Sequence, residues 1–159
     1  MARSDFRFAH RMRVRYAEID AQRIVFNTRY LEYMDVGVTE YFRAVGRTAL
    51  EHPDGGEAEF HVARNTIDYK RPLAYDELFD VCMRCARIGT SSMTYLWEIH
   101  GMENGEGQED LRALGESISV HVGSLGARPS PVPQRIIDTF EAYEGRSLRN
   151  SAPAREAAE

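Results

Sequence analysis

Lysine is almost absent from this chain of 159 residues, because Lys70 is the only lysine among 20 basic side chains. Acidic side chains number 25, so the formal net charge at pH 7 is −5. Proteins that bind nucleic acid usually carry an excess of basic side chains on one surface. The charge balance therefore argues against nucleic acid as a partner.

Long apolar segments are also missing. No run of apolar residues is longer than three, whereas a membrane-spanning helix needs about 20. The opening MARSDFRFAHRMR contains no apolar stretch that could act as a signal peptide. We therefore expect no membrane span and a cytoplasmic location.

Cysteine is scarce too, with only Cys82 and Cys85, which form a C-x-x-C pair. Such a pair can belong to a redox or metal site. However, a structural zinc site needs four ligands, and no second pair of ligands is present. Residues three apart in a strand also point to opposite faces. The sequence predicts structural cysteines and no metal.

Residues 28–45 have the periodicity of one long amphipathic helix. Asn27 or Thr28 suits its N-cap, and Gly46 suits the left-handed position that often follows a helix. The apolar residues recur three or four positions apart and include Tyr30, Met34, Gly37, Val38, Tyr41, Phe42 and Val45.

The remainder of the chain has mainly the alternation of β-strands. A single helix cannot cover both faces of a five-stranded sheet, so we expect a homo-oligomer, either a dimer or a dimer of dimers. One domain over 1–145 is predicted, followed by a flexible tail over 146–159. The predicted strands are 10–16, 60–69, 78–88, 92–100 and 111–123, with loops at 51–59 and 101–110 and a short helix at 133–143.

The segment RYAEIDAQRIVFNTRYLEYMDVGVTEYF, residues 15–42, resembles the signature of the hotdog-fold acyl-CoA thioesterases. The similar branch contains 4-hydroxybenzoyl-CoA thioesterase and the Tol-Pal-associated acyl-CoA thioesterases. YKRPLAYDEL at 69–78 and IGTSSMT at 88–94 are similar to the family's turns between successive strands. The resemblance implies an α+β hotdog fold, in which a five-stranded antiparallel sheet wraps one long helix.

The same resemblance implies hydrolysis of an acyl-CoA thioester to a carboxylic acid and free coenzyme A, with no cofactor besides the coenzyme A of the substrate. It makes Asp20 the catalytic carboxylate. An aspartate with a pKa near 3.9 is ionised at neutral pH, so Asp20 can act as a general base or as a nucleophile. The helix N-terminal amide near Asn27 is the expected oxyanion donor.

The expected substrate-binding residues are Tyr30, which could line an apolar pocket, and Ser91 and Ser92, which resemble a family position that presents a hydroxyl. Lys70 and Arg71 are candidates for the coenzyme A phosphates, because cations bind phosphate well; Arg128 is a further candidate.

The chain departs from the family pattern at two positions. Arg23 replaces a usual glycine, and Asn27 stands where many members have histidine or tyrosine. The departures leave two alternatives open: a thioesterase that acts on acyl carrier protein, and a catalytically silent acyl-CoA binding protein. Asp20 could also serve only to cap a turn, and Asn27 only to cap the helix.

Overall fold

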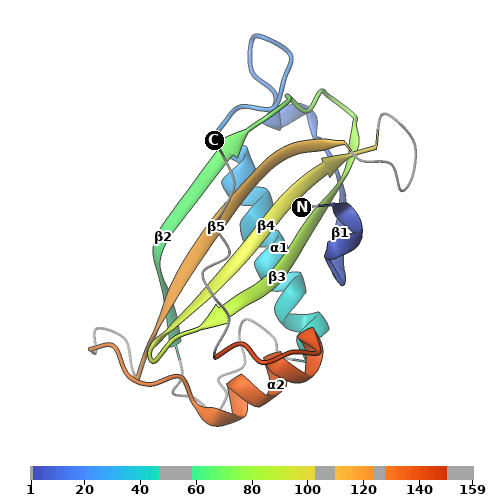
Figure 1. Cartoon of the computed structure of the whole chain (residues 1–159). Coiled ribbons are helices and arrows are strands. Elements are labelled where there is room, and N and C mark those ends of the chain that lie inside the picture. The colour runs from blue at the N-terminus through green and yellow to red at the C-terminus, as the bar shows by residue number, and fades with distance from the viewer. Residues whose placement is uncertain (1, 47–58, 103–109, 124–127, 150–159) are drawn as a thin grey trace, which may run out of the picture.

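The computed structural model describes residues 2–46, 59–102, 110–123 and 128–149. Five antiparallel strands form one sheet in the order β1-β3-β4-β5-β2, and the long helix α1 packs against one of its faces (Figure 1). The predicted α+β architecture is therefore confirmed. The elements are β1 (Phe8–Arg13), α1 (Arg29–Val45), β2 (Glu59–Tyr69), β3 (Leu78–Ile88), β4 (Ser92–Gly101), β5 (Leu111–Val122) and α2 (Gln134–Glu144).

Helix α1 forms where the apolar periodicity predicts it. Its buried residues recur along one face, and Gly46 adopts the left-handed conformation with φ of 101° at the C-cap. Thr28 occupies the N-cap position, although its side chain makes no capping hydrogen bond. Gly37 allows close approach to the sheet, since a Cβ there would lie 2.6 Å from Cγ1 of Val81 in β3.

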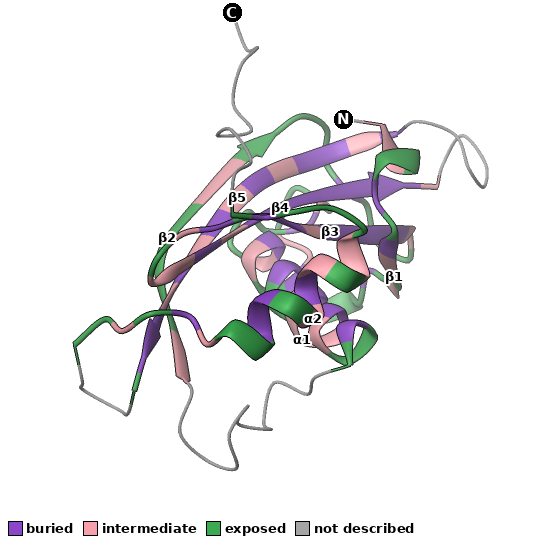
Figure 2. Ribbon diagram, turned by 60° about the horizontal axis from the view of Figure 1, so that its bottom comes forward, coloured by how far each residue is buried: buried purple, intermediate pink, exposed green. Residues whose placement is uncertain are grey.

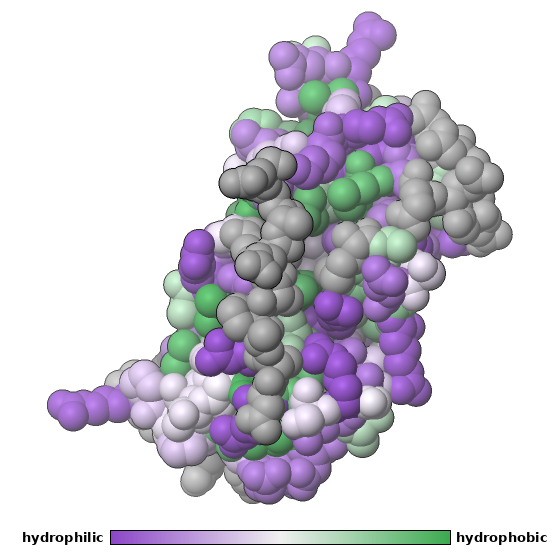
Figure 3. All heavy atoms as spheres, in the orientation of Figure 1, coloured by the Kyte–Doolittle hydropathy of each residue, from purple (hydrophilic) through white to green (hydrophobic). Residues whose placement is uncertain are grey.

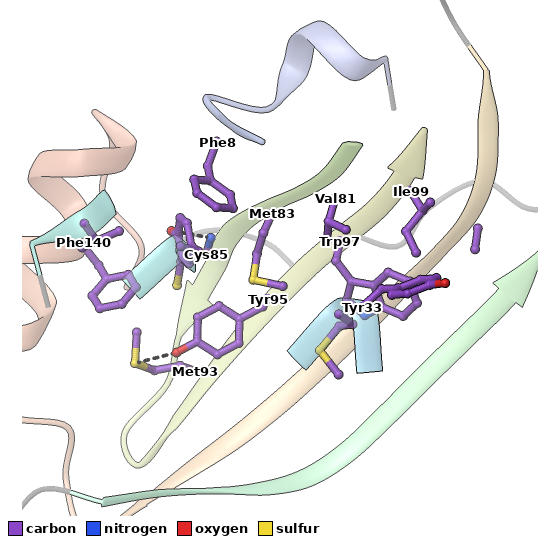
Figure 4. Packing of buried hydrophobic residues seen from close by; sticks show 14 of the residues in the cluster. Phe8, Tyr33, Val81, Met83, Cys85, Met93, Tyr95, Trp97, Ile99 and Phe140 are labelled. Atoms are coloured by element: carbon purple, nitrogen blue, oxygen red, sulfur yellow. Dashed lines mark hydrogen bonds between the residues drawn. The ribbon is translucent and has the colours of Figure 1, made fainter. Parts of the chain in front are cut away.

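The core lies between α1 and the inner faces of β3 and β4. Figure 4 shows Met83 of β3 and Tyr95 of β4 side by side in this space, where the Tyr95 hydroxyl donates to Sδ of Met93 at 3.4 Å. Both cysteines are buried, and neither is in a disulfide; Cys85 belongs to the core cluster, whereas Cys82 does not. The core also binds α2 to the sheet, through Ile136, Ile137 and Phe140.

The opposite face of the sheet is mixed in character, with hydrophilic and hydrophobic residues side by side (Figure 3). Two charged or polar side chains of β4 are almost fully buried there: Nε2 of His100 lies 2.8 Å from a carboxylate oxygen of Glu98. Within the parts of the chain that the structure describes, no helix is long and apolar enough to span a membrane, and no group of three His, Cys, Asp or Glu side chains could hold a metal ion.

The first predicted strand, 10–16, is displaced by about two residues. β1 pairs with β3 only as far as Arg13, opposite Leu78, and Tyr16 falls in a short 3-10 helix, Tyr16–Glu18, with 77% of its surface exposed. The alternation of Met12, Val14 and Tyr16 predicts a strand that would continue past the first residue of its partner strand β3. The predicted end of this strand is therefore wrong.

The chain stays attached to the sheet beyond the predicted domain end at 145. Leu148 is buried and its carbonyl accepts the Ile88 N–H at 3.0 Å, while the Arg146 guanidinium donates to the carbonyls of Cys85 and Ala86. The rest of the predicted tail, 150–159, lies outside the described residues, as do most of the predicted loops 51–59 and 101–110.

Candidate active site

Asp20 begins a tight turn in the loop that joins β1 to α1. Its N–H donates to the Ile24 carbonyl and its own carbonyl accepts the Arg23 N–H, both at 2.9 Å. Oδ1 of its half-buried carboxylate accepts the Gln22 N–H at 2.7 Å. No donor in the described residues reaches Oδ2. Asp20 therefore caps a turn through one carboxylate oxygen, and the other oxygen accepts no hydrogen bond from the described residues.

Arg23 occupies the left-handed region, with φ of 64°. A residue with a Cβ loses about 1–2 kcal/mol in this conformation, which glycine adopts without strain. The left-handed conformation at this position explains the glycine that is usual there in the family pattern. The Arg23 side chain is exposed and does not line the cavity described below.

We expect Arg23→Gly to be more stable than Arg23→Ala by about 1 kcal/mol, because alanine keeps the left-handed strain and glycine removes it. Urea denaturation of the two variants measures the difference. Equal midpoints and slopes would mean that the turn relaxes without strain.

A cavity of about 260 Å³ opens between the start of α1 and the end of β2. This volume lies just below the range of about 300–1,000 Å³ that is typical of drug-sized ligands. Asp20 is not in its lining but neighbours it through the bond to Ile24. The lining residues are Ile24, Val25, Asn27, Tyr30, Tyr69, Lys70, Arg71 and Pro72.

Two tyrosines hold the walls of this cavity together. The rings of Tyr30 and Tyr69 meet edge to face, with centroids 5.3 Å apart. The Tyr69 hydroxyl donates to the Asn27 carbonyl at 2.8 Å, and the Tyr30 hydroxyl accepts the Leu73 N–H at 3.0 Å. Burial raises the pKa of both phenols, so both remain neutral at physiological pH.

The amides at the start of α1 differ in their hydrogen bonding. The Arg29 N–H donates to Phe26 and the Leu31 N–H to Thr28. In the described chain, the Asn27 N–H has no acceptor. An unpaired amide at the positive end of a helix dipole can stabilise a developing oxyanion. The exposed Asn27 side chain makes no capping bond.

The two basic residues in the cavity wall are held differently. Arg71 donates from Nη1 to Oδ1 of Asp110 at 2.8 Å, and the Asp110 carboxylate is fully buried. Lys70 is exposed, and its ammonium group has no ion-pair partner among the described residues. Lys70 is thus the cation of this wall that a ligand can approach without competing with an acidic side chain.

Arg112 underlies this wall and was not expected from the sequence. It is 2% exposed and donates from Nε and Nη2 to the two oxygens of Asp110, at 2.8 and 2.7 Å. It also donates from Nη1 to Oε2 of Glu77 and to the Pro72 carbonyl. Its backbone carbonyl accepts the N–H groups of Lys70 and Arg71. Arg112 thereby fixes the turn that forms one side of the cavity.

Ser91 and Ser92 lie at the other end of the sheet. Ser91 lies in the hairpin between β3 and β4, and Ser92 is the first residue of β4. The Ser91 carbonyl accepts the His121 N–H and the Ser92 carbonyl accepts the Gly89 N–H. Tyr69 of the cavity wall pairs with Ala113 of β5, whereas Ser92 pairs with Val120, seven residues further along the same strand. This separation corresponds to about 23 Å. Within one chain the structure does not bring these serines to the cavity, whereas it does gather Asn27, Tyr30, Lys70 and Arg71.

Comparison with known proteins identifies the family. The sequence model of the family described as the thioesterase superfamily matches residues 22–107, which is more than half of the chain. The chain belongs to the thioesterase superfamily. The match begins two residues after Asp20 and includes the whole cavity lining.

Proteins from several bacteria resemble the chain along most of its length. YneP of Bacillus subtilis, provisionally named an acyl-CoA thioesterase, is 30% identical over 82% of this chain and 91% of its own. A Thermus thermophilus thioesterase, solved with coenzyme A and zinc, has a TM-score of 0.74 and 29% identity, covering 91% of this chain and 98% of that one.

The PA5185 protein of Pseudomonas aeruginosa is equally similar in structure, with a TM-score of 0.74 and 27% identity over 95% of this chain and 97% of its own. These similarities confirm the hotdog fold that the sequence predicted. Together with the family match, they identify the chain as a thioester hydrolase.

Proposed function

We propose that this thioester hydrolase acts on acyl-CoA, with Asp20 as the catalytic carboxylate and the Asn27 amide as oxyanion donor. The observation that supports this assignment is that both groups adjoin the cavity: Asn27 lines it, and the Asp20 N–H is bonded to the carbonyl of Ile24, another lining residue. Among the described residues, one carboxylate oxygen of Asp20 accepts no hydrogen bond and the Asn27 N–H has no acceptor. The Thermus relative with bound coenzyme A supports the choice of carrier.

The thiolate leaving group needs little protonation by the enzyme, because a thiol ionises near pH 8.5. As a general base, Asp20 takes a proton from water while the water oxygen bonds to the thioester carbon. The carbonyl oxygen becomes an oxyanion that accepts the Asn27 N–H. Collapse of the intermediate breaks the carbon–sulfur bond and releases the carboxylic acid and the coenzyme A thiolate, which is then protonated.

As a nucleophile, Asp20 would instead bond to the thioester carbon and expel the thiolate, leaving an anhydride that water hydrolyses. Both routes give the same products and need the same oxyanion donor. Oxygen-18 from labelled water enters Asp20 in one turnover only when water attacks the aspartyl carbon of the anhydride, which would identify the nucleophilic route.

Lys70 is the proposed contact for a coenzyme A phosphate, since Arg71 is already paired with Asp110. We expect Lys70→Ala to weaken coenzyme A binding about 10-fold, as the loss of one charge-assisted hydrogen bond implies. Arg71→Ala should have a smaller effect. Titration calorimetry with coenzyme A measures both; a larger loss for Arg71→Ala would contradict the assignment.

Acyl carrier protein is the alternative carrier. Initial rates with one acyl group presented on coenzyme A and on acyl carrier protein distinguish the two. The proposal predicts a higher kcat/KM for the coenzyme A ester. A clear preference for the protein carrier would replace the substrate while keeping the catalytic residues.

A homodimer is proposed through β2, which is an edge strand of the sheet. Most of its residues are exposed, including Val62 at 62% and Tyr69 at 48%, as the green and pink ribbon of Figure 2 illustrates. A long exposed edge strand readily pairs with another chain. Antiparallel pairing of two β2 strands would bring the Ser91–Ser92 end of one sheet to the cavity end of the other.

Sedimentation equilibrium tests the assembly directly. A mass of twice the 18.1 kDa chain is expected for the dimer, and four times that mass for a dimer of dimers. A monomer at micromolar concentration would contradict the proposal.

A further inference from the structure

Glu18 is a buried carboxylate two residues before Asp20, and the mechanism above gives it no role. It is 2% exposed and ends the short 3-10 helix Tyr16–Glu18. Its Oε2 accepts the Arg15 N–H at 2.8 Å and the Tyr33 hydroxyl at 2.6 Å. Its Oε1 accepts Nε of Arg15 at 2.7 Å. Both carboxylate oxygens are therefore fully used by protein donors.

These contacts join the loop to the helix. Tyr33 lies in the second turn of α1, one turn beyond Tyr30 of the cavity wall. The backbone carbonyl of Glu18 also accepts the Phe26 N–H at 3.0 Å, immediately before Asn27. Glu18 thus holds both ends of the segment that carries Asp20, and it attaches that segment to α1, which begins two residues after Asn27.

Between these two ends the loop has little freedom. Ile19 and Val25 form an antiparallel bridge, and Asp20 and Ile24 are joined by a backbone hydrogen bond. A rigid loop transmits a shift at its base to its tip. Hence the position of the Asp20 carboxylate relative to the Asn27 amide depends on where Glu18 is held.

We propose that Glu18, bound to the Tyr33 hydroxyl, is a positioning residue that sets the Asp20 carboxylate against the helix N-terminus. This inference rests on the proposed function. Glu18 itself contacts neither the cavity nor, by these hydrogen bonds, the reacting atoms. Misplacement of a catalytic group by about 1 Å can cost about 100-fold in rate.

Glu18 stays ionised in this role. Burial acts to raise the pKa of its carboxyl, but the hydrogen bonds from Arg15 and Tyr33 and the Arg15 charge outweigh burial, and the pKa is lowered overall. An anion accepts stronger hydrogen bonds than a neutral acid. Glutamine would keep the shape of the side chain but would weaken both the Tyr33 and the Arg15 contacts.

The test is a double-mutant cycle with thiol release from acyl-CoA as the readout. Glu18→Gln and Tyr33→Phe are each made in the native chain and in Asp20→Asn. Tyr33→Phe covers the possibility that Glu18→Gln does not fold, because it removes one donor and leaves the Arg15 pair intact. Glu32→Gln is the matched control: an exposed carboxylate on α1, paired with Arg29.

In the native background we expect each test variant to lower kcat about 10- to 100-fold with little change in KM. In the Asp20→Asn background the same changes should have almost no further effect, because the group they position is already lost. Glu32→Gln should match the native chain. Thermal unfolding, recorded for every variant, corrects the rates for the folded fraction.

Equal fold-losses in both backgrounds, or an unchanged kcat after correction, would overturn the positioning role while the proposed function stands. Failure of the native chain to release thiol would overturn both. If Asp20→Asn loses activity and neither test variant does, the positioning role of Glu18 is wrong and the catalytic role of Asp20 stands.

Discussion

Asp20→Asn is expected to lower kcat for acyl-CoA hydrolysis by about 100-fold or more, which is the usual contribution of a general base. The amide oxygen can still accept the Gln22 N–H that Oδ1 accepts now, so the turn should survive. An amide, however, can neither take a proton from water nor attack a thioester. Free-thiol release at saturating acyl-CoA measures the loss.

A matched control distinguishes the loss of the catalytic carboxylate from the loss of one negative charge elsewhere on the chain. Asp138→Asn changes another aspartate that accepts a hydrogen bond, from Gln134 of α2, and it should leave kcat unchanged. Circular dichroism and thermal unfolding should be the same for both variants. Native-like kcat in Asp20→Asn would remove Asp20 from the mechanism.

Arg112→Met is expected to lower the free energy of unfolding by about 3–5 kcal/mol, because it leaves buried acidic groups without their cation. The Asp110 carboxylate is fully buried, and Arg112 is its bidentate partner. The exposed Arg71 alone cannot replace both bonds. Urea denaturation at pH 7 measures the change.

Arg13→Met serves as the comparison, since Arg13 and Asp76 form an ion pair in which both side chains are more than half exposed. Exposed pairs contribute about 0–1 kcal/mol. A similar cost for the two variants would mean that water reaches Asp110. A large cost for Arg112→Met alone would support the buried network. A weaker affinity for coenzyme A should accompany it, because the variant loses the bond from Nη1 to the Pro72 carbonyl that fixes the turn after Lys70.

The fold could be predicted largely from local patterns. The period of α1 and the glycine after it placed that helix within one residue of its observed start, and the limits of β3 were predicted correctly. β1 was misplaced because alternation in the sequence carries no information on where a partner strand ends; β3 begins at Leu78, opposite Arg13.

Some residues of the candidate site could likewise be predicted from local sequence patterns, and others could not. Asn27 was proposed from the family resemblance, Lys70 and Arg71 as cations suited to phosphate, and Tyr30 as a pocket residue. All four line the same cavity. The Arg112 network was not predicted, because its members come from separate turns and strands and only the folded chain brings them together. Glu18 was missed for another reason: an acidic residue in a polar loop looks exposed until Tyr33 is placed beside it.

The serines were assigned from resemblance alone, and their distance from the cavity depends on the topology of the sheet. Ser91 and Ser92 can reach the cavity end only if a second chain contributes them. The assembly state is therefore part of the functional question.

Release of free thiol from a panel of short, long and aromatic acyl-CoA esters by the native chain is the most direct test of the central claim. Turnover well above the uncatalysed rate is expected for at least one class of ester, and the preferred class identifies the acyl group. No turnover of any ester by a folded chain that binds coenzyme A would contradict it, and would indicate an acyl-CoA binding protein instead.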